Sequence, residues 1–304
     1  MKSKNSGYLF AIITILIWGT TFISTKILLV DFEPTEILFL RFLIGFIALI
    51  VVCPKRLRIE DKKREFVFAL AGLCGICMYY LLENIALTYT MASNVGVIIS
   101  AAPFFTGMLS KIFIKDSEKL HMNFYIGFII AMVGVFCISF SGQELHLNPM
   151  GDLLAVGAAF VWACYSVITK KISSWGYSTI QTTRRTFAYG LVFIIPSLFL
   201  FHQHSMDFYN IIKPLNLFNI LFLGLGASAL CFVTWNLAVK VLGAVKTTSF
   251  IYMVPVITII SSVIILNEPI TKMEVLGTVL TLTGLIVSEK NIFSRITYSK
   301  KVKA

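Results

Sequence analysis

The sequence predicts an all-α integral membrane protein with ten transmembrane helices, arranged as two inverted five-helix repeats. Hydrophobic residues make up 57% of the chain and charged residues only 13%, with a mean hydropathy of +0.85, which is too apolar for a soluble domain. A triplet recurs 144 residues later with unchanged spacing: Trp18, Lys26 and Arg41, then Trp162, Lys170 and Arg185. Each half holds five apolar runs, and an odd number of spans inverts the second copy relative to the first.

The first repeat is expected at residues 1–142. A run of about 20 apolar residues crosses the ~30 Å hydrocarbon core, and charges, prolines and polar clusters divide this half into five such runs. They are residues 8–30, 35–52, 65–89, 93–114 and 122–140. The connections between them are very short, so the helices are expected to be antiparallel neighbours.

The second repeat is expected at residues 143–304, including a short basic cytoplasmic tail. Its runs are residues 151–171, 179–201, 217–239, 246–266 and 271–288. Beyond the second helix of each half, equivalent residues are offset by 152 positions in the next two helices: Asn84 answers Asn236, and Pro103 answers Pro255. The matches keep the same order along both halves, as an internal duplication requires.

The net charge of +11 reflects membrane topology rather than a nucleic-acid partner. With the N-terminus in the cytoplasm, 20 of the 26 Lys and Arg residues fall in cytoplasmic segments, and only Lys213 and Lys272 fall in outside loops. The positive-inside rule therefore predicts that both termini are cytoplasmic. The expected location is the bacterial cell (inner) membrane, with the first apolar run retained as a span.

Metal and redox chemistry are not expected. Cys74 and Cys77 form a C-x-x-C pair at membrane depth without nearby His or acidic residues, which favours small packing residues over a metal site. The sequence contains no phosphate-binding loop of the G-x-x-x-x-G-K-[ST] type. We therefore expect no cofactor, no catalytic residues and no direct use of ATP.

The residues resemble the EamA-type domain of the drug/metabolite transporter superfamily. The resemblance is carried by Trp18-Gly-Thr-Thr-Phe22 with Lys26, Pro34 and Arg41, by the segment 84–93, by Ala102-Pro103, and by Glu118 leading into Gly127 and Gly134. Residues 244–284 resemble the second copy, whereas Ala163-Cys164-Tyr165 depart from the Gly-Thr-Thr of the first. The resemblance implies a ten-helix carrier that works by alternating access, with a central cavity lined by the first, third and fourth helices of each half.

Glu83 is the sharpest candidate for function. An ionised carboxylate well inside a membrane helix costs about 2–3 kcal/mol on insertion scales, so it should face protein or water. It is either a proton-coupling or ammonium-binding carboxylate, or it pairs with Arg41 or Lys26 in the same outer half.

Aromatic and amide side chains complete the expected substrate site. Trp18 and Trp162 fall near mid-membrane, the wrong depth for an interfacial tryptophan. The aromatic candidates either wall a cavity or pack as bulky core residues, and the two amides need partners in lipid. The full set of substrate-binding candidates is Trp18, Tyr79, Glu83, Asn84, Trp162, Tyr165, Trp235, Asn236 and Tyr252. We expect the substrate near Glu83, Asn84, Trp235 and Asn236, between the third, fourth, eighth and ninth helices.

Four basic residues lie within predicted helices at mirrored depths. Lys26 and Arg41 lie toward the outside, and Lys170 and Arg185 toward the cytoplasm. They act as gates or charge pairs, or else they snorkel to the headgroups or neutralise local acids. Arg184 has no counterpart in the first half and is assigned no role.

Pro103 and Pro255 each interrupt a helix and are candidate hinges. Kinks of this kind are also ordinary in membrane helices. The glycines of the two closing helices, at positions 127, 134, 277 and 284, are expected to form close-packing faces.

The predicted function is secondary-active transport, most plausibly export of amino acids or related small metabolites, the commonest role in the family that the chain resembles. Alternatives are transport of lipophilic cations or drugs, or of nucleotide-type metabolites, and exchange or import of a metabolite. A channel would need a continuous polar stripe, and an enzyme would need clustered catalytic residues. The expected partners are a small-molecule substrate, the lipid bilayer, and protons or a counter-substrate, in a monomer or weak homodimer.

Overall fold

The computed structural model describes residues 4–59, 61–89, 92–114, 121–139, 148–201, 208–266 and 271–289, and a few side chains within these ranges, Lys26 among them, lie outside the description. Within these ranges every regular element is helical. The predicted all-helical fold is therefore confirmed for this part of the chain.

The helices of the first half follow the predicted apolar runs. They are α1 (Lys4–Leu28), α2 (Pro34–Val52), α3 (Lys62–Gly72), η1 (Leu73–Met78), α4 (Tyr79–Tyr89), α5 (Ala92–Ile99), α6 (Ala102–Phe113) and α7 (Met122–Ser139). Two features begin α2 directly after a short turn. Pro34 is its first residue, where a backbone N–H would have no intrahelical partner. The Glu36 side chain accepts a hydrogen bond from the Glu33 backbone N–H at 2.9 Å.

The second half repeats this order. Its helices are α8 (Pro149–Ser173), α9 (Thr179–Phe201), α10 (Phe208–Ile212), α11 (Pro214–Leu221), η2 (Phe222–Leu230), α12 (Cys231–Leu242), α13 (Ala244–Ser249), η3 (Phe250–Tyr252), α14 (Met253–Leu266) and α15 (Lys272–Glu289). At the start of α8, the Asn148 side chain accepts hydrogen bonds from the backbone N–H groups of Met150 and Gly151. These bonds satisfy two of the free donors at the helix start.

Each half contains a π-helical segment within its third helical run. The elements η1 and η2 are π-helices, and residues 73–78 correspond to residues 225–230 at the 152-residue offset. A π-helix carries wider i to i+5 hydrogen bonding, occurs mostly inside α-helices, and is frequent at functional sites. Hydrophobic periodicity does not reveal such segments, so the sequence alone predicted uninterrupted helices here.

Breaks precede both candidate hinge prolines. The predicted run 93–114 is divided into α5 and α6 by a break at Ser100 and Ala101, and Pro103 is the second residue of α6. In the other half, the 3-10 turn η3 comes between α13 and α14, and Pro255 is the third residue of α14. The prolines therefore stand just inside the start of a new helix, where a missing N–H is tolerated.

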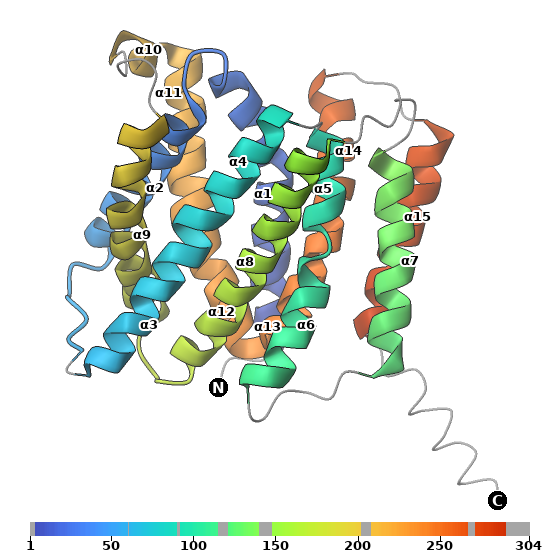
Figure 1. Ribbon diagram of the computed structural model, residues 1–304, viewed down its shortest axis with the longest axis horizontal. Coiled ribbons are helices and arrows are strands. Elements are labelled where there is room, and N and C mark those ends of the chain that lie inside the picture. The colour runs from blue at the N-terminus through green and yellow to red at the C-terminus, as the bar shows by residue number, and fades with distance from the viewer. Residues whose placement is uncertain are drawn as a thin grey trace, which may run out of the picture.

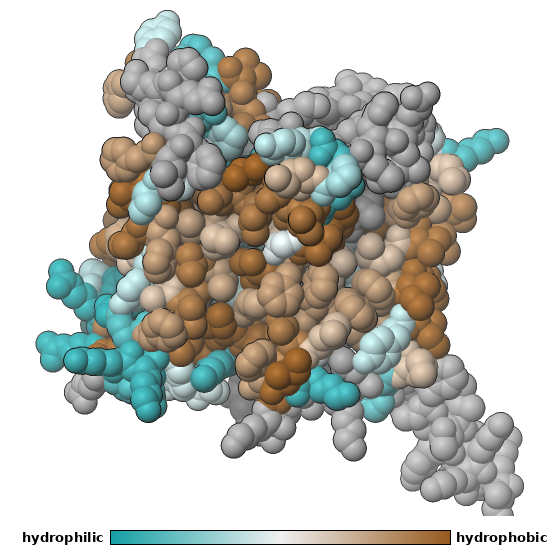
Figure 2. Space-filling model, in the orientation of Figure 1, coloured by the Kyte–Doolittle hydropathy of each residue, from teal (hydrophilic) through white to brown (hydrophobic). Residues whose placement is uncertain are grey.

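The helices form a bundle with two chemically different ends (Figure 1). The N-terminal end of α1, the α2–α3 connection and the α8–α9 connection lie at one end, and the α1–α2 connection and α10 lie at the other. The α2–α3 connection carries Lys55, Arg56 and Arg58, all exposed, so we call this end the basic end. Figure 2 shows an apolar band over the middle of the bundle, with hydrophilic residues gathered toward the basic end.

Several described helices are long and apolar enough to cross a membrane. Six qualify by length and composition: Lys4–Thr25, Pro34–Val52, Lys62–Ala86, Pro149–Ser173, Pro214–Leu242 and Ala244–Ser261. Met122–Ile138 is a shorter apolar helix. These spans are typical of a multi-pass membrane protein.

The closing helices of the two halves, α7 and α15, cross in backbone contact. A Cβ atom placed on Gly134 would lie 2.5 Å from the backbone N of Thr281, and one on Gly284 would lie 2.4 Å from the backbone N of Ala131. Gly127 and Gly277 show the same close approach. The prediction that these four glycines form close-packing faces is confirmed, and the contact is of the small-residue type that joins membrane helices.

This contact gives a test with a matched control. Gly134→Ala should lower the thermal unfolding midpoint in detergent, because the added methyl group forces α7 and α15 apart. Gly96→Ala is the control, since a Cβ there meets nothing within 4 Å and alanine favours a helix by about 1 kcal/mol over glycine. Equal midpoints for the two variants would contradict the close crossing.

Candidate functional site

Aromatic rings from four helices meet in the core of the bundle. We call this group the aromatic cluster; its members are Trp18, Tyr79, Tyr80, Trp162, Tyr165, Phe232 and Trp235. The ring centroids of Trp18 and Trp162 are 5.3 Å apart, and Trp235 lies 5.1 Å from Trp18 and 5.8 Å from Trp162. Tyr79 and Tyr165 contact Trp162 at 4.8 and 5.2 Å. Five predicted substrate-binding residues thus come together, with their rings packed against one another.

The three tryptophans differ in how their indole N–H groups are used. Trp18 donates a 2.9 Å hydrogen bond to the backbone carbonyl of Ala227, inside the π-helical segment η2. Within the described part of the chain, the buried N–H groups of Trp162 and Trp235 have no hydrogen-bond partner. A buried donor without a partner costs about 1–3 kcal/mol, so these two groups are available to an acceptor that enters the cluster.

Glu83 lies at the edge of the aromatic cluster. It is 8% exposed, and the Tyr79 hydroxyl one turn earlier on α4 is hydrogen-bonded to its carboxylate. Its Oε2 atom has no hydrogen-bond partner among the described residues. One carboxylate oxygen is therefore held by the protein, and the other is left for a proton or a donor.

Arg41 is buried within the protein. It is 6% exposed, its Nε donates to the Ser228 hydroxyl at 3.1 Å, and its Cζ lies 4.5 Å from the centre of the Tyr80 ring. It also interacts electrostatically with Glu83. The snorkelling interpretation is wrong for this residue, because a hydroxyl and an aromatic face take the place of headgroups and water.

The other expected substrate-site residues lie in different surroundings. Asn84 donates to the Pro34 carbonyl at 3.3 Å and so ties α4 to the start of α2. Asn236 accepts from the Tyr165 hydroxyl at 3.0 Å and donates to the Thr183 hydroxyl at 2.9 Å. The two amides therefore bind different helices and do not share one site.

Tyr252 also lies away from the aromatic cluster. It is fully buried with Ala131 and Leu285, next to the crossing of α7 and α15. The expectation that it lines the same cavity as Trp18 and Trp162 is therefore not met. Tyr252 is the last residue of the 3-10 turn η3, directly before α14.

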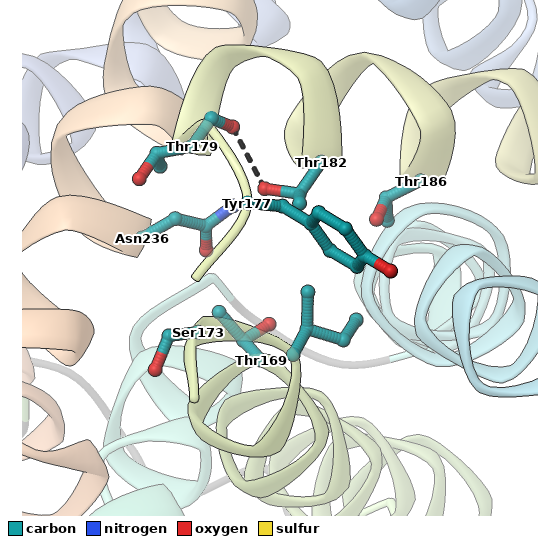
Figure 3. A pocket seen from close by; sticks show the side chains of 8 residues that line it. Thr169, Ser173, Tyr177, Thr179, Thr182, Thr186 and Asn236 are labelled. Atoms are coloured by element: carbon teal, nitrogen blue, oxygen red, sulfur yellow. Dashed lines mark hydrogen bonds between the residues drawn. The ribbon is translucent and has the colours of Figure 1, made fainter. Parts of the chain in front are cut away.

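A hydroxyl-lined pocket lies between α8, α9 and α12 (Figure 3). Its free volume is only about 10 Å³, which is room for about one water molecule. Figure 3 shows Thr169 and Ser173 of α8 on one side, Thr182 of α9 on the other, and Asn236 of α12 at the wall. Its complete lining is Thr169, Ile172, Ser173, Tyr177, Thr179, Thr182, Thr186 and Asn236.

A wider, more open pocket adjoins it through the shared residue Thr179. It is lined by Lys4, Ser178, Thr179, Ile180, Val233, Leu237, Lys240 and Val241, with about 1150 Å³ of space between atoms, part of it open to solvent. Lys4 begins α1, and Ser178 belongs to the α8–α9 connection, so this pocket opens at the basic end (Figure 1). Asn236 thus connects Tyr165 of the aromatic cluster to the hydroxyl-lined pocket.

The remaining predicted gate residues make contacts near helix ends. Lys170 donates to the backbone carbonyls of Val239 and Lys240, where α12 is about to end. Arg185 pairs with the carboxylate of Glu65, which also accepts a hydrogen bond from Tyr189. Arg185 therefore neutralises a local acid, one of its two predicted roles. The side chain of Lys26 lies outside the described residues.

Arg184, to which the sequence assigned no role, joins two helices. It donates to the backbone carbonyls of Cys53 and Lys55, just beyond the end of α2. The last carbonyls of a helix lack intrahelical partners, so a buried cation can hold them. A repeat alignment could not identify this contact, because Leu40 stands at the equivalent position in the first half.

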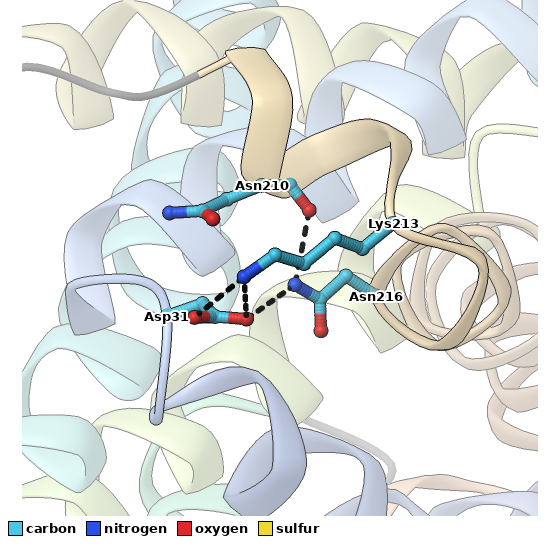
Figure 4. A network of polar contacts seen from close by, with 4 residues as sticks. All are labelled: Asp31, Asn210, Lys213 and Asn216. Carbon is cyan, nitrogen blue, oxygen red and sulfur yellow. Dashed lines mark hydrogen bonds and ion pairs between the residues drawn. The ribbon is translucent and has the colours of Figure 1, made fainter.

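Asp31 is the second feature that the sequence missed. It lies in the α1–α2 connection, where Lys213 donates to its Oδ1 at 3.2 Å and Asn216 donates to its Oδ2 at 2.7 Å (Figure 4). The hydrogen bonds from Asn216 and Lys213 hold the pKa of Asp31 below its ordinary value. The carboxylate is therefore ionised at neutral pH, and it joins two connections that are 182 residues apart in the sequence.

The described helices form a bundle with several apolar, membrane-length spans and with aromatic and charged side chains buried at its centre. The chain belongs to the EamA-like transporter family, whose model matches residues 5–140 and 149–289. The resemblance found in the sequence is thus confirmed, and the family lies in the drug/metabolite transporter superfamily.

Relatives with similar sequences cover nearly the whole chain. An uncharacterized transporter of Archaeoglobus fulgidus is 28% identical over 90% of this chain and 95% of its own. A protein of Escherichia coli named a probable amino-acid metabolite efflux pump is 26% identical over 99% of both chains. A crystal structure with 19% identity superposes with a TM-score of 0.78, covering 97% of this chain and 99% of the other, which supports the fold.

The unequal use of the tryptophan N–H groups can be tested by one substitution at two equivalent positions. Trp18→Phe leaves the Ala227 carbonyl without its donor, whereas Trp162→Phe removes a donor that has no acceptor. We expect Trp18→Phe to lower stability by about 1 kcal/mol more than Trp162→Phe, seen as a lower thermal unfolding midpoint in detergent. A larger loss for Trp162→Phe would show that the hydrogen-bond assignment is wrong.

Proposed function

We propose that the protein is a secondary-active transporter that exports amino acids or related small metabolites by alternating access. It crosses the bacterial inner membrane ten times, as two inverted repeats at residues 1–142 and 143–304, with both termini in the cytoplasm. The basic end is then the cytoplasmic end, as the positive-inside rule requires.

The inverted-repeat architecture is supported by features that recur at equivalent positions. The π-helical segments η1 and η2 correspond, as do the helix breaks before Pro103 and Pro255. The crossing of α7 and α15 is itself symmetric: Gly127 faces Gly284, and Gly134 faces Gly277. Two similar bundles in opposite orientations can exchange conformations, and the exchange moves an opening from one membrane face to the other.

The observation that carries the proposal is the chemistry of the aromatic cluster. Among the residues that the structure describes, one carboxylate oxygen of Glu83 and the indole N–H groups of Trp162 and Trp235 have no hydrogen-bond partner, and all three lie at or beside the packed aromatic rings. An amino acid offers an ammonium group to a carboxylate, a carboxylate to N–H donors, and a side chain to the rings. Binding of this kind requires the packed rings to separate, and the π-helical segments beside them provide backbone that can rearrange.

The direction of transport is supported by two observations. The wider pocket opens at the basic end and adjoins the hydroxyl-lined pocket at Thr179, which supports entry of a solute from the cytoplasmic side. The Escherichia coli relative, 26% identical, carries the name of an amino-acid metabolite efflux pump. An exporter binds its substrate from the cytoplasm and releases it outside the cell.

A second candidate is the export of lipophilic cations. Glu83 within an aromatic environment would suit a flat cation without any carboxylate. The two candidates differ in the role of the indole N–H groups, which bind an anionic group in amino-acid transport and are unused in cation transport. Competition of amino acids and their carboxamides against the same flux separates them.

Flux in reconstituted vesicles tests the role of Glu83. Glu83→Gln should lower the transport rate by about tenfold or more, the effect of losing one charge-assisted hydrogen bond of about 1.5–3 kcal/mol, and should flatten its dependence on pH. Glu274→Gln, an exposed carboxylate at the start of α15, serves as the control and should transport normally. If Glu83→Gln keeps both the rate and the pH dependence, the carboxylate is structural and proton coupling through it fails.

A further inference from the structure

Two side-chain contacts join the halves of the protein at opposite ends of the bundle. The first is the group of Asp31, Lys213 and Asn216, which we call the outer latch (Figure 4). Lys213 donates to both oxygens of Asp31 at 3.2 and 3.3 Å, and Asn216, 3% exposed, donates to Oδ2 at 2.7 Å. The amide of Asn216 also donates to the Asn210 carbonyl at 2.9 Å. The outer latch thus fastens the α1–α2 connection to the start of α11.

The second contact lies at the basic end and consists of Arg64, Trp175 and Tyr177, which we call the inner clamp. Arg64 Nη1 donates to the Tyr177 hydroxyl at 2.8 Å. Its Cζ lies 5.3 Å from the centre of the Trp175 ring and 5.9 Å from that of Tyr177. The inner clamp fastens the α8–α9 connection to the start of α3.

The two contacts occupy equivalent positions in the repeat. The 144-residue offset of the first two helices places Trp175 opposite Asp31, and the 152-residue offset of the third helix places Asn216 opposite Arg64. The bond between Asn216 and Asp31 at one end thus corresponds to the contact between Arg64 and Trp175 at the other. In each case the connection after a half's first helix is held to the start of the other half's third helix.

We propose that the outer latch and the inner clamp are the two gates of the transport cycle, each of which opens while the other stays closed. This inference rests on the proposed function, since it assigns the end with Asp31 to the outside and the basic end to the cytoplasm. Opening either gate separates the first helix of one half from the third helix of the other. Those helices also carry Trp18, Trp162 and Trp235, so the same movement parts the rings of the aromatic cluster.

The gates are built from different chemistry. The outer latch is an ion pair with an added hydrogen bond from the side-chain amide of Asn216. The side chains of Lys213 and Asp31 are 41% and 27% exposed. The inner clamp is a guanidinium held against aromatic faces. A partly exposed ion pair and a partly exposed cation–π contact are both weak, because water competes for the charged groups. Both gates are therefore weak enough to open during a transport cycle.

The experiment measures the accessibility of one cysteine next to each gate. Thr35 and Thr179 are repeat-equivalent: Thr35 is buried next to the start of α2, and Thr179 lines both pockets at the basic end. In a background with all six native cysteines replaced, Thr35→Cys is labelled from outside with a membrane-impermeant thiol reagent in whole cells. Thr179→Cys is labelled from the cytoplasmic side in inside-out vesicles.

Each gate is opened by a substitution that has a matched control. Lys213→Gln breaks the outer latch, and Lys272→Gln removes an exposed lysine at the start of α15. Arg64→Gln breaks the inner clamp, and Arg58→Gln removes an exposed arginine in the same α2–α3 connection. If Lys213→Gln does not accumulate in the membrane, Asn216→Ser is used in its place. This variant removes only the hydrogen bonds that the Asn216 amide donates to Asp31 and Asn210.

We expect Lys213→Gln to raise the labelling rate of Thr35→Cys from outside about two- to fivefold and to lower that of Thr179→Cys from the cytoplasm. Arg64→Gln should do the reverse, by about two- to fivefold. The two controls should leave both rates unchanged. An increase on both faces, equal effects of variant and control, or no change with either variant would overturn the assignment of the gates.

This test separates the gates from the proposed function, because labelling needs no substrate. If vesicle flux detects no amino-acid export while the labelling of the two faces still changes in opposite directions, the proposed substrate is wrong and the gates stand. If export is found and the opposite changes are absent, the gates are wrong and the proposed function stands.

Discussion

The constraint on which the rest of the structure depends is the absence of water in the hydrocarbon core, because every buried polar group must find its partner within the chain. Backbone groups meet this demand by forming helices throughout the described ranges. Side chains meet it across helices: Thr14 and Thr234 share a hydrogen bond at 2.6 Å, and Arg41 is held by Ser228 and the Tyr80 ring. Polar residues thus decide which helices are neighbours, and the apolar residues fill the space between them.

Backbone carbonyls at helix ends and in irregular segments are the main acceptors for the long side chains. Lys170 reaches the end of α12, Arg184 reaches carbonyls beyond the end of α2, and Trp18 reaches Ala227 in η2. Carbonyls at these places lack regular intrahelical partners or are displaced from them. Two cationic side chains and one indole thus donate to the same kind of backbone acceptor, and each of these hydrogen bonds holds one helix in position against another.

The helical fold was predictable because apolar runs bounded by charges and prolines leave few alternatives, and the glycines at i and i+7 marked the crossing of α7 and α15. The π-helical segments were not, since their residues have the same composition as ordinary membrane helix. The structure brings together five of the aromatic candidates, whereas Asn84 and Tyr252 lie apart from them. Depth alone does not say which way a side chain points. Asp31 and Arg184 escaped notice because their partners, Lys213 and the Cys53 and Lys55 carbonyls, are more than 100 residues away.

The exceptions to the constraint are as informative as the rule. Among the described residues, several buried polar atoms are left without hydrogen-bond partners, and some of them, such as those of Ser110 and Tyr252, lie apart from the others. Three lie close together: the Trp162 and Trp235 N–H groups and the Glu83 Oε2 atom, at about 1–3 kcal/mol for each neutral donor and more for the carboxylate. All three belong to the aromatic cluster or contact it through Tyr79, where the first and third helices of both halves meet. Elsewhere in the chain, buried or half-buried polar side chains do find partners: Arg41, Lys170, Arg184 and Asn236 are all hydrogen-bonded to other groups of the protein. Their common location is explained if a bound solute, carrying both a donor and an acceptor, completes them during transport.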